Sequence, residues 1–344
     1  MYYLLPVLIS GLILLVSACA PRYKGPVTDH FDGKKFFNPG MSERGTGSLL
    51  KWLLNRDKGP WPDQPDAYVG DRPATRIEGD SLVITFVNHS TFLIQTAGLN
   101  ILTDPVWSKR VGPTSWLGIK RKRPPGLRFE ELPPIDVVLL SHNHYDHLDL
   151  PTIKKLVKAH NPLFVTPLGV SHLPKSVDGR TTRELDWNDT LTITEKLRLT
   201  CTQAQHFSNR GMGDRDETLW CGYLLHTSFG ITYFCGDSGY GPHFKRIAEQ
   251  AERAGGPIKL ALLPIGSYRP EWFMAPVHVS PAGAVQAFID VKAQQAVGIH
   301  FGTFQQGDDG LFEPANDLKK ALNEHAIPES KFLVPQEGRP MVFK

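Results

Sequence analysis

Short apolar stretches separated by polar or glycine turns follow one another from about residue 82 onward. Stretches of this length and composition are typical of strands rather than helices. We expect strands at residues 82–87, 92–95, 101–102, 137–140, 197–202, 220–225, 231–235, 260–263 and 296–299. The run at 137–140 is continuously aliphatic, which predicts a strand that is buried on both faces of its sheet.

Helical patterns are interleaved with these strands. Pro151 suits a first helical turn because its missing N–H is not needed there, and Ile153, Leu156 and Val157 supply an apolar stripe. Further helices are expected at residues 244–254, 281–289 and 315–326. Strands alternating with helices predict a layered α/β sandwich, and we assign residues 81–344 to one domain.

Residues 19–80 differ in composition and are interpreted as an N-terminal arm. They are rich in Gly, Pro, Asp and Lys, with one apolar patch at residues 48–56. In that patch Leu49, Leu50, Trp52, Leu53 and Leu54 would cover one broad side of a short amphipathic helix. The helix could pack on the main domain, which we favour, or rest on lipid.

The first residues have the pattern of a secretory signal. Residues 3–16 are apolar, and Val16-Ser17-Ala18-Cys19 follows. The run is short for a membrane span, whereas a signal peptide needs only ~7–15 apolar residues. Its ending resembles the lipobox of bacterial lipoproteins, in which the cysteine, here Cys19, is the lipid-modified first residue. We therefore expect a signal peptide at 1–18 and a lipid-anchored domain outside the cytoplasm, in the periplasm or at the outer membrane of the bacterial cell envelope; an uncleaved anchor is the alternative.

The overall composition serves mainly to exclude classes of protein and partner. Hydrophobic residues make up 41% and charged residues 21%, which are ordinary globular proportions. The net charge of +3 is too small to indicate a nucleic-acid partner. Beyond Cys19 the chain has Cys201, Cys221 and Cys235, an odd number that predicts core packing rather than a disulfide framework; a bridge between Cys201 and Cys221 is the less favoured alternative.

A dense group of chemically active residues comes directly after the buried run at 137–140. It reads His142-Asn143-His144-Tyr145-Asp146-His147. Buried imidazole and carboxylate are costly unless they are paired or bound to metal, and both are suitable ligands for zinc and related ions. His142 and His144 could hold one ion while Asp146 and His147 face a second at ~3.5–4 Å from it, as in two-metal hydrolases.

Candidates for the remaining ligands lie at the ends of later strands. His206, Asp237 and His300 each follow an apolar run, and glycines on both sides of Asp237 would allow the backbone to approach a metal closely. Each of them alone would more often be a structural residue. Together with the cluster, they complete two coordination spheres.

The motif H-x-H-x-D-H, followed by His206, Asp237 and His300, resembles the metallo-β-lactamase superfamily. Further runs, over roughly residues 84–340, resemble its N-acylphosphatidylethanolamine-hydrolysing phospholipase D family. These runs include Leu102-Thr103-Asp104-Pro105, Pro264-Ile265-Gly266, Trp272-Phe273-Met274 and His300-Phe301-Gly302-Thr303-Phe304. The resemblance implies the αβ/βα four-layer sandwich with metals at one edge.

The same resemblance implies a role for each matching residue. It implies two divalent ions, zinc above all, with Asp237 bridging both. The first ion would be held by His142, His144 and His206, and the second by Asp146, His147 and His300. His278 matches a family histidine beside the metals that is implicated in catalysis, so His278 and Asp146 are our candidate catalytic residues.

The resemblance implies a metal-dependent phosphodiesterase acting on glycerophospholipids, in which a hydroxide held by two zinc ions is the nucleophile. His278 would stabilise the phosphate or protonate the leaving group. A lipidated Cys19 would keep the domain beside its phospholipid substrate. Two alternatives remain: a lactonase or other carbonyl hydrolase with the same metal site, and a non-catalytic metal-binding envelope lipoprotein. The complete ligand set disfavours the latter.

Three features have more than one interpretation. Asp104 could orient a ligand histidine or cap the turn before Pro105. His89 could line the pocket or hold a structural turn. The run Lys120-Arg121-Lys122-Arg123 could meet anionic lipid headgroups, although we favour a solvated loop.

Overall fold

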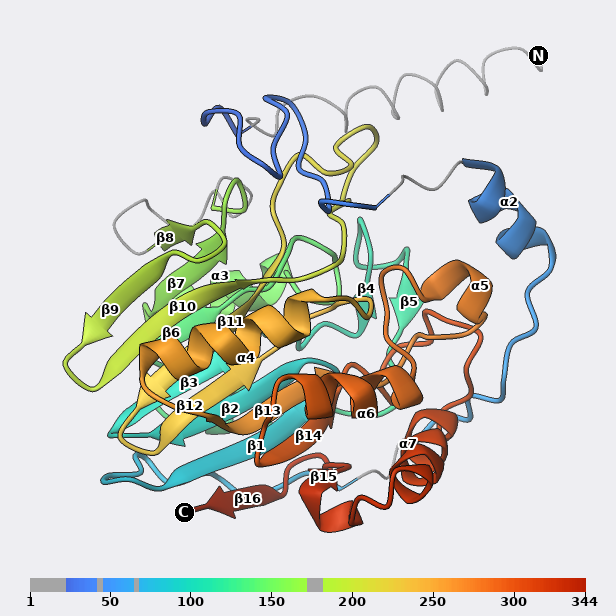
Figure 1. Ribbon diagram of the computed structural model, residues 1–344. Helices are drawn as coiled ribbons and strands as arrows, with labels where there is room; N and C mark the ends of the chain where they lie inside the picture. Colours follow the sequence, from blue (N-terminus) through green and yellow to red (C-terminus); the bar gives the residue numbers. More distant parts are fainter. Residues whose placement is uncertain (1–22, 42–45, 65–67, 172–181) are drawn as a thin grey trace, which may run out of the picture.

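The computed structural model describes residues 23–41, 46–64, 68–171 and 182–344 (Figure 1). The predicted signal peptide, residues 1–18, and Cys19 lie outside these ranges. Within them, no helix combines the length and the apolar character that a membrane crossing requires.

The strands of the described residues form two seven-stranded sheets and a separate two-stranded hairpin. In spatial order, the first sheet contains β16 (Pro340–Phe343), β1 (Leu82–Asn88), β2 (Thr91–Thr96), β3 (Leu99–Thr103), β6 (Val137–Leu139), β7 (Leu163–Pro167) and β8 (Thr182–Leu185). The second contains β15 (Phe332–Leu333), β14 (Gln295–Ile299), β13 (Ile258–Pro264), β12 (Gly230–Phe234), β11 (Cys221–Thr227), β10 (Leu197–Gln203) and β9 (Thr190–Thr194). The hairpin joins β4 (Arg110–Val111) to β5 (Ile119–Lys120).

Both sheets follow the same plan of strand directions. In the first sheet, β16, β1, β2 and β3 pair antiparallel, whereas β3, β6, β7 and β8 pair parallel. In the second, β9 to β12 pair antiparallel and β12 to β15 pair parallel. Parallel neighbours need crossover connections, and helices supply those from β6 to β7 and from β12 through to β15.

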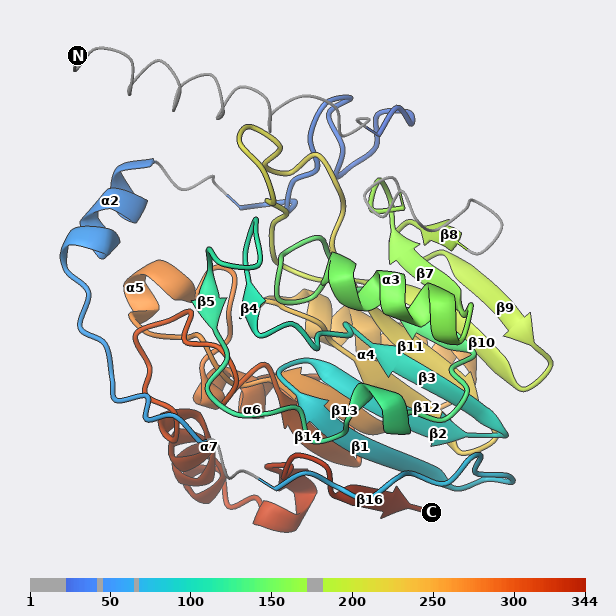
Figure 2. The ribbon, with the colours of Figure 1, turned by 180° about the vertical axis from the view of Figure 1, so that it is seen from behind.

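Helices cover the two outer faces. α4 (His243–Ala254) and α6 (Pro281–Asp290) lie over the second sheet (Figure 1), and α3 (Leu150–Ala159) lies over the first (Figure 2). α7 (Glu313–Glu324) packs beside α6, and the short α5 (Glu271–Met274) precedes α6 in the chain. The predicted αβ/βα four-layer sandwich is therefore confirmed.

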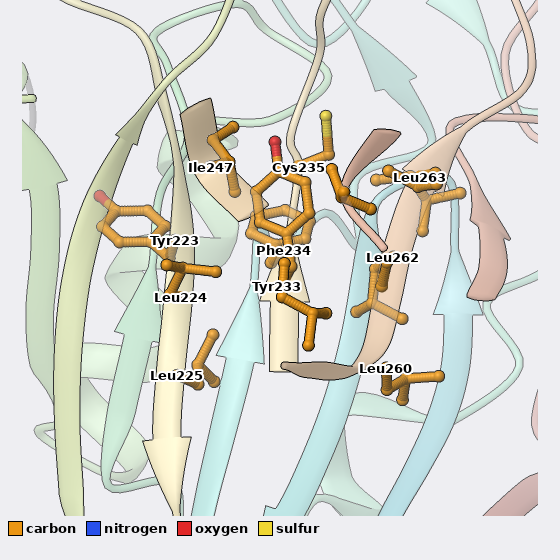
Figure 3. Close-up of a cluster of buried hydrophobic side chains, with 14 of the residues drawn as sticks. Tyr223, Leu224, Leu225, Tyr233, Phe234, Cys235, Ile247, Leu260, Leu262 and Leu263 are labelled. Atoms are coloured by element: carbon orange, nitrogen blue, oxygen red, sulfur yellow. The ribbon is translucent and has the colours of Figure 1, made fainter. Parts of the chain in front are cut away.

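The main hydrophobic core fills the space between the sheets. On β6 and the residue that follows it, Val137 and Leu139 join this core, whereas Val138 and Leu140 join a second cluster beneath α3. The continuous aliphatic run thus reflects burial on both faces, as predicted. Burying one such side chain contributes about 1.5–3 kcal/mol. In the second sheet, fully buried Tyr223, Phe234 and Leu262 come from neighbouring strands (Figure 3).

The cysteines belong to this core. Cys201, Cys221 and Cys235 are buried free thiols. Cys201 and Cys221 lie on adjacent strands, but Cys201 is directly opposite Tyr223. The two residues are therefore diagonal neighbours, an arrangement that places Cβ atoms farther apart than a disulfide requires. Core packing is the role that the structure gives them.

The arm docks along one side of the domain through aromatic and polar contacts. Its helix α2 (Thr46–Leu54) places Trp52 on Phe273 of α5, with ring centroids 4.8 Å apart. Trp52 Nε1 donates a hydrogen bond to Asp308 at 2.9 Å. The α2 leucines stay exposed, by 48 to 75% of their surface: Leu49, Leu50, Leu53 and Leu54. Docking onto the domain thus holds for Trp52 but not for the leucines.

The basic run at 120–123 is only in part the solvated loop that we favoured, because Lys120 keeps 58% of its side chain exposed. Arg121 is buried, and its Nε and Nη2 donate to the carbonyl oxygens of Ser108 and Val106 at 2.9 and 3.1 Å. Arg123 pairs with the buried Glu337. A buried guanidinium needs several acceptors, and these carbonyls provide them. Part of the run is therefore structural, and the favoured interpretation was wrong for Arg121 and Arg123.

Candidate metal centre

The ends of several strands from the two sheets bring the predicted site residues together. The His142–His147 segment follows β6 of the first sheet. His206, Asp237 and His300 follow β10, β12 and β14 of the second sheet. Their side chains are almost all buried, and they form overlapping groups of ligand atoms within 4.8 Å of one another. Strand C-terminal ends therefore position this site, as the sequence predicted.

One group consists of three imidazoles, which we term the first group. His142 Nε2 lies 2.8 Å from His144 Nδ1, and His206 Nε2 lies 3.2 Å from the same His144 atom. Three ring nitrogens thus converge on one point. His206 is held from behind, because its Nδ1 donates to the carbonyl oxygen of Val277 at 2.9 Å.

The second group consists of Asp146, His147 and His300. Asp146 Oδ2 lies 3.0 Å from His147 Nε2 and 3.4 Å from His300 Nε2. His147 is fixed by Asp104, which accepts from its Nδ1 at 2.7 Å. Asp104 also accepts from the Ser141 backbone N–H and hydroxyl, so it orients His147 rather than only capping a turn.

Asp237 lies between the two groups. Its Oδ2 is 3.0 Å from His300 Nε2 and 3.2 Å from His147 Nε2 in the second group. The same oxygen is 3.7 Å from His206 Nε2 and 4.0 Å from His142 Nε2 in the first group. A single carboxylate therefore faces both groups, which is the position that a bridging ligand requires.

The first group is electrostatically suited to remain neutral. Burial, which disfavours the charged imidazolium, lowers the pKa of His142 and His206 well below the usual range. It also lowers the pKa of His144 to about 4. Metals bind the unprotonated imidazole, so these residues need not release a proton at neutral pH to bind an ion.

The second group is dominated by its carboxylates. Burial alone would lower the pKa of His300, but Asp237 and Asp146 raise it to about 9. Burial alone would raise the pKa of Asp237, but His147 and His300 lower it well below the usual range. The buried carboxylates therefore favour a positive charge beside them. Either a protonated histidine or a metal ion can supply that charge.

The donor set fits divalent cations. Within the described part of the chain, His147 Nε2, His300 Nε2 and Asp237 Oδ1 are buried without a hydrogen-bond partner. Buried polar atoms are nearly always satisfied, so unsatisfied atoms on three residues of one site indicate a missing partner. Imidazole nitrogen and carboxylate oxygen are the ligands that zinc and similar ions prefer.

His278 lies beside both groups. Its Nδ1 is 3.9 Å from Asp237 Oδ2, and its ring centroid is 5.1 Å from those of His206 and His300. Its side chain keeps 13% of its surface exposed, whereas the Asp237 side chain keeps 1%. Burial lowers the pKa of His278 to about 3. The residue thus lies where a molecule entering from solvent would meet the cluster.

His89 is a member of the site that the sequence left undecided. Its Nε2 lies 2.7 Å from Asp146 Oδ2, and the side chain is buried. The available signal was its position directly after the β1 strand, at the sheet edge that also carries the His142–His147 segment. A lone histidine between Asn88 and Ser90 carried no spacing that would reveal this contact.

Comparison with known proteins agrees with this geometry. Residues 99–301 match a family model described as a beta-lactamase superfamily domain. The N-acyl-phosphatidylethanolamine-hydrolyzing phospholipase D 1 of Caenorhabditis elegans is 36% identical over 311 residues, which are 85% of this chain and 86% of that protein. The chain belongs to the N-acylphosphatidylethanolamine-hydrolysing phospholipase D family of the metallo-β-lactamase superfamily.

A second family member and a solved structure are also similar to this chain, the latter in fold. The mitochondrial N-acyl-phosphatidylethanolamine-hydrolyzing phospholipase D of Saccharomyces cerevisiae is 37% identical over 251 residues, 72% of this chain and 53% of its own length. An isothiocyanate hydrolase from Delia radicum gut bacteria shares the fold, with a TM-score of 0.58, 21% identity and coverage of 76% of this chain and 99% of that one. This phospholipase D family protein is thus a metal-dependent hydrolase with a His/Asp cluster able to bind metal.

Proposed function

We propose that this protein is a phospholipase D-type phosphodiesterase that hydrolyses glycerophospholipids, releasing the headgroup alcohol and leaving phosphatidic acid. One observation carries the proposal: the complete set of seven ligand-type side chains converges at one site in a chain 36% identical to a named N-acylphosphatidylethanolamine phospholipase D over most of its length. A non-catalytic metal-binding lipoprotein would have no need to keep every member of the set.

The proposed ligands follow from the two groups. His142, His144 and His206 would hold one divalent ion, Asp146, His147 and His300 a second, and Asp237 would contact both. Zinc is the proposed metal because the ligands are nitrogen and oxygen and the family resemblance points to it. When bound, two divalent ions supply Lewis acidity toward phosphoryl oxygens and lower the pKa of water.

The protein's own residues would supply orientation and hydrogen bonds. Asp104 holds His147 with its proton on Nδ1, which leaves Nε2 free to face the second group. His278 would act on the substrate: a neutral imidazole still carries one N–H, which can donate to a phosphoryl oxygen or to the departing headgroup oxygen. Placement beside Asp237, outside both groups of proposed ligands, supports that role.

A lipid surface is the proposed setting. The exposed α2 leucines and Trp272 of α5, itself 51% exposed, form an apolar surface, and Lys51 Nζ lies 5.0 Å from the Trp272 ring centroid. Helices with leucine and tryptophan on one side and a basic residue nearby are suited to a membrane interface. We propose that the lipidated Cys19 anchors the chain in the bacterial cell envelope with this surface toward the lipid.

A substrate screen tests the function. The purified full-length protein in detergent, loaded with Zn²⁺, would be offered phosphatidylethanolamine, its N-acyl form, simple lactones and a chromogenic phosphodiester. We expect phosphatidic acid and headgroup alcohol as products, and in ¹⁸O-water the label should enter the phosphatidic acid because water attacks phosphorus. Label in the alcohol, or preferred turnover of lactones, would instead favour a different hydrolase of the same fold.

A further inference from the structure

His89 occupies an unusual backbone conformation at the end of β1. Its φ is +48°, in the left-handed region that bulky residues rarely adopt. Backbone contacts fix this conformation: His89 N–H donates to Thr303 Oγ1 at 2.9 Å, and its carbonyl oxygen accepts from His300 N–H at 2.9 Å. A rare conformation held from both sides is typical of a residue whose side chain has a function.

The side chain points at the second group. Its Nε2 is 2.7 Å from Asp146 Oδ2, the shortest contact of that oxygen with a ring nitrogen, since His147 and His300 lie at 3.0 and 3.4 Å. The His89 ring also packs on the His300 ring, with centroids 4.1 Å apart. With the His147 ring centroid 5.3 Å away, His89 therefore contacts all three residues of the second group.

The proton positions distinguish His89 from His147. A hydrogen bond to a carboxylate oxygen needs a proton on the nitrogen, because that oxygen only accepts. His147 makes its hydrogen bond through Nδ1, to Asp104, and its Nε2 has no hydrogen-bond partner and is available to a cation. His89 makes its hydrogen bond through Nε2, to Asp146, so the nitrogen nearest the group donates and cannot ligate an ion while that bond is made.

We propose that His89 is a positioning residue that fixes the Asp146 carboxylate, and the adjacent His300, for the ion of the second group. The inference rests on the ligand assignment proposed above. Because the His89 side chain contacts Asp146, His147 and His300, its removal should weaken metal binding at the second group and leave the first group largely unaffected.

Two substitutions separate this role from simple packing. His89→Asn suits the left-handed backbone but is too short to reach Asp146, so it removes the hydrogen bond without adding backbone strain. His89→Gln is longer and restores an N–H donor. His30→Asn is the matched control, because His30 is also buried and bonded to a carboxylate, with Nε2 2.8 Å from Asp186 Oδ1, but lies outside the metal groups.

The readout is Zn²⁺ binding to the metal-free full-length protein, measured by competition with a chromogenic chelator and by elemental analysis after gel filtration. We expect two ions in the wild type. His89→Asn should weaken one ion about 10–100-fold, the range for residues that orient ligands. His89→Gln should recover part of that loss, and His30→Asn should bind both ions normally.

The outcomes also separate this inference from the function. A wild type with two ions and a His89→Asn protein with two ions of unchanged affinity overturn the positioning role alone. Equal weakening of both ions overturns it as well, because it indicates general loosening. A wild type that never exceeds one ion overturns the ligand assignment, and the inference with it. None of these readings depends on which substrate is hydrolysed.

Discussion

Asp104 accepts a hydrogen bond from His147 Nδ1 at 2.7 Å, and both side chains are fully buried. This contact fixes the tautomer that leaves His147 Nε2 facing the second group. Asp104→Asn keeps the shape but replaces one acceptor oxygen by a donor, which favours the wrong tautomer. We expect Zn²⁺ affinity to fall about 10–100-fold, measured by chelator competition. The control is Asp136→Asn, where the carboxylate accepts from Asn100 N–H away from the site.

Removal of the shared carboxylate should change metal stoichiometry. Asp237 Oδ2 lies within 4.0 Å of a ring nitrogen from each group. Asp237→Ala deletes the contact common to both ions and leaves two dications close together without the negative charge between them. We expect elemental analysis after zinc loading to fall from two ions per chain to one or fewer. A variant that retained both ions would contradict a bridging role.

The residues that gather at the site could be predicted from the sequence because their spacing along the chain is informative, while their roles as metal ligands stay a prediction. The H-x-H-x-D-H motif indicates a metal site from the sequence alone. Positions directly after predicted strands were enough to identify His206, Asp237 and His300 as further candidate ligands. The role of Asp104 and the membership of His89 depend on which strand ends meet across the sandwich. That pairing is a tertiary property, so the sequence could only leave alternatives open.

The fold, like the site, has elements that the sequence predicted and elements that it did not. Strands buried on two faces, such as 137–140, are visible as aliphatic runs, and α6 begins at the predicted Pro281. Edge strands were not predicted: β9 (Thr190–Thr194) has outward residues on alternate positions and few large apolar side chains. β7 (Leu163–Pro167) is buried, but it is short and ends in proline, a residue that disfavours a strand, so the sequence did not indicate a strand there. The repeated plan of the two sheets left no visible repeat in the sequence.

The two neighbours Lys120 and Arg121 should respond differently to truncation. Arg121 is buried and donates to two carbonyl oxygens, whereas Lys120 keeps 58% of its side chain exposed. Arg121→Ala removes the charged donor from both carbonyl oxygens and leaves Val106 with Asn88 Nδ2 alone, so the free energy of unfolding should fall by about 1.5–3 kcal/mol. Lys120→Ala should change it by less than about 0.5 kcal/mol. Urea unfolding followed by fluorescence measures both; equal effects would contradict a structural role for Arg121.

The N-terminal signal can be tested on the native protein. We expect residues 1–18 to be absent and Cys19 to carry lipid, because an apolar run leads into Val16-Ser17-Ala18-Cys19. Mass spectrometry of the protein extracted from membranes reads both features at once. Cys19→Ser should release the protein from the membrane fraction. An intact Met1, or an unmodified Cys19 in the mature chain, would exclude lipidation.

Activity and metal content should separate at His278. The side chain is partly exposed beside the cluster, with 13% of its surface accessible, and its Nδ1 is 3.9 Å from Asp237 Oδ2. If it donates to the substrate rather than binding metal, His278→Ala should lower kcat about 10²–10⁴-fold, the usual range for proton donation, while both ions stay bound.

The matched control for that variant is His226→Ala. His226 lies half-buried on β11, where it contacts Thr200 at 3.0 Å, and the histidine-to-alanine change there removes the same atoms outside the metal groups. Its kcat should stay close to that of the wild type. Loss of an ion from His278→Ala would mean that His278 is a ligand. Full activity of His278→Ala with both ions bound would contradict a role for His278 in catalysis. The departing headgroup oxygen would then take its proton from another group, because alanine has no N–H to donate.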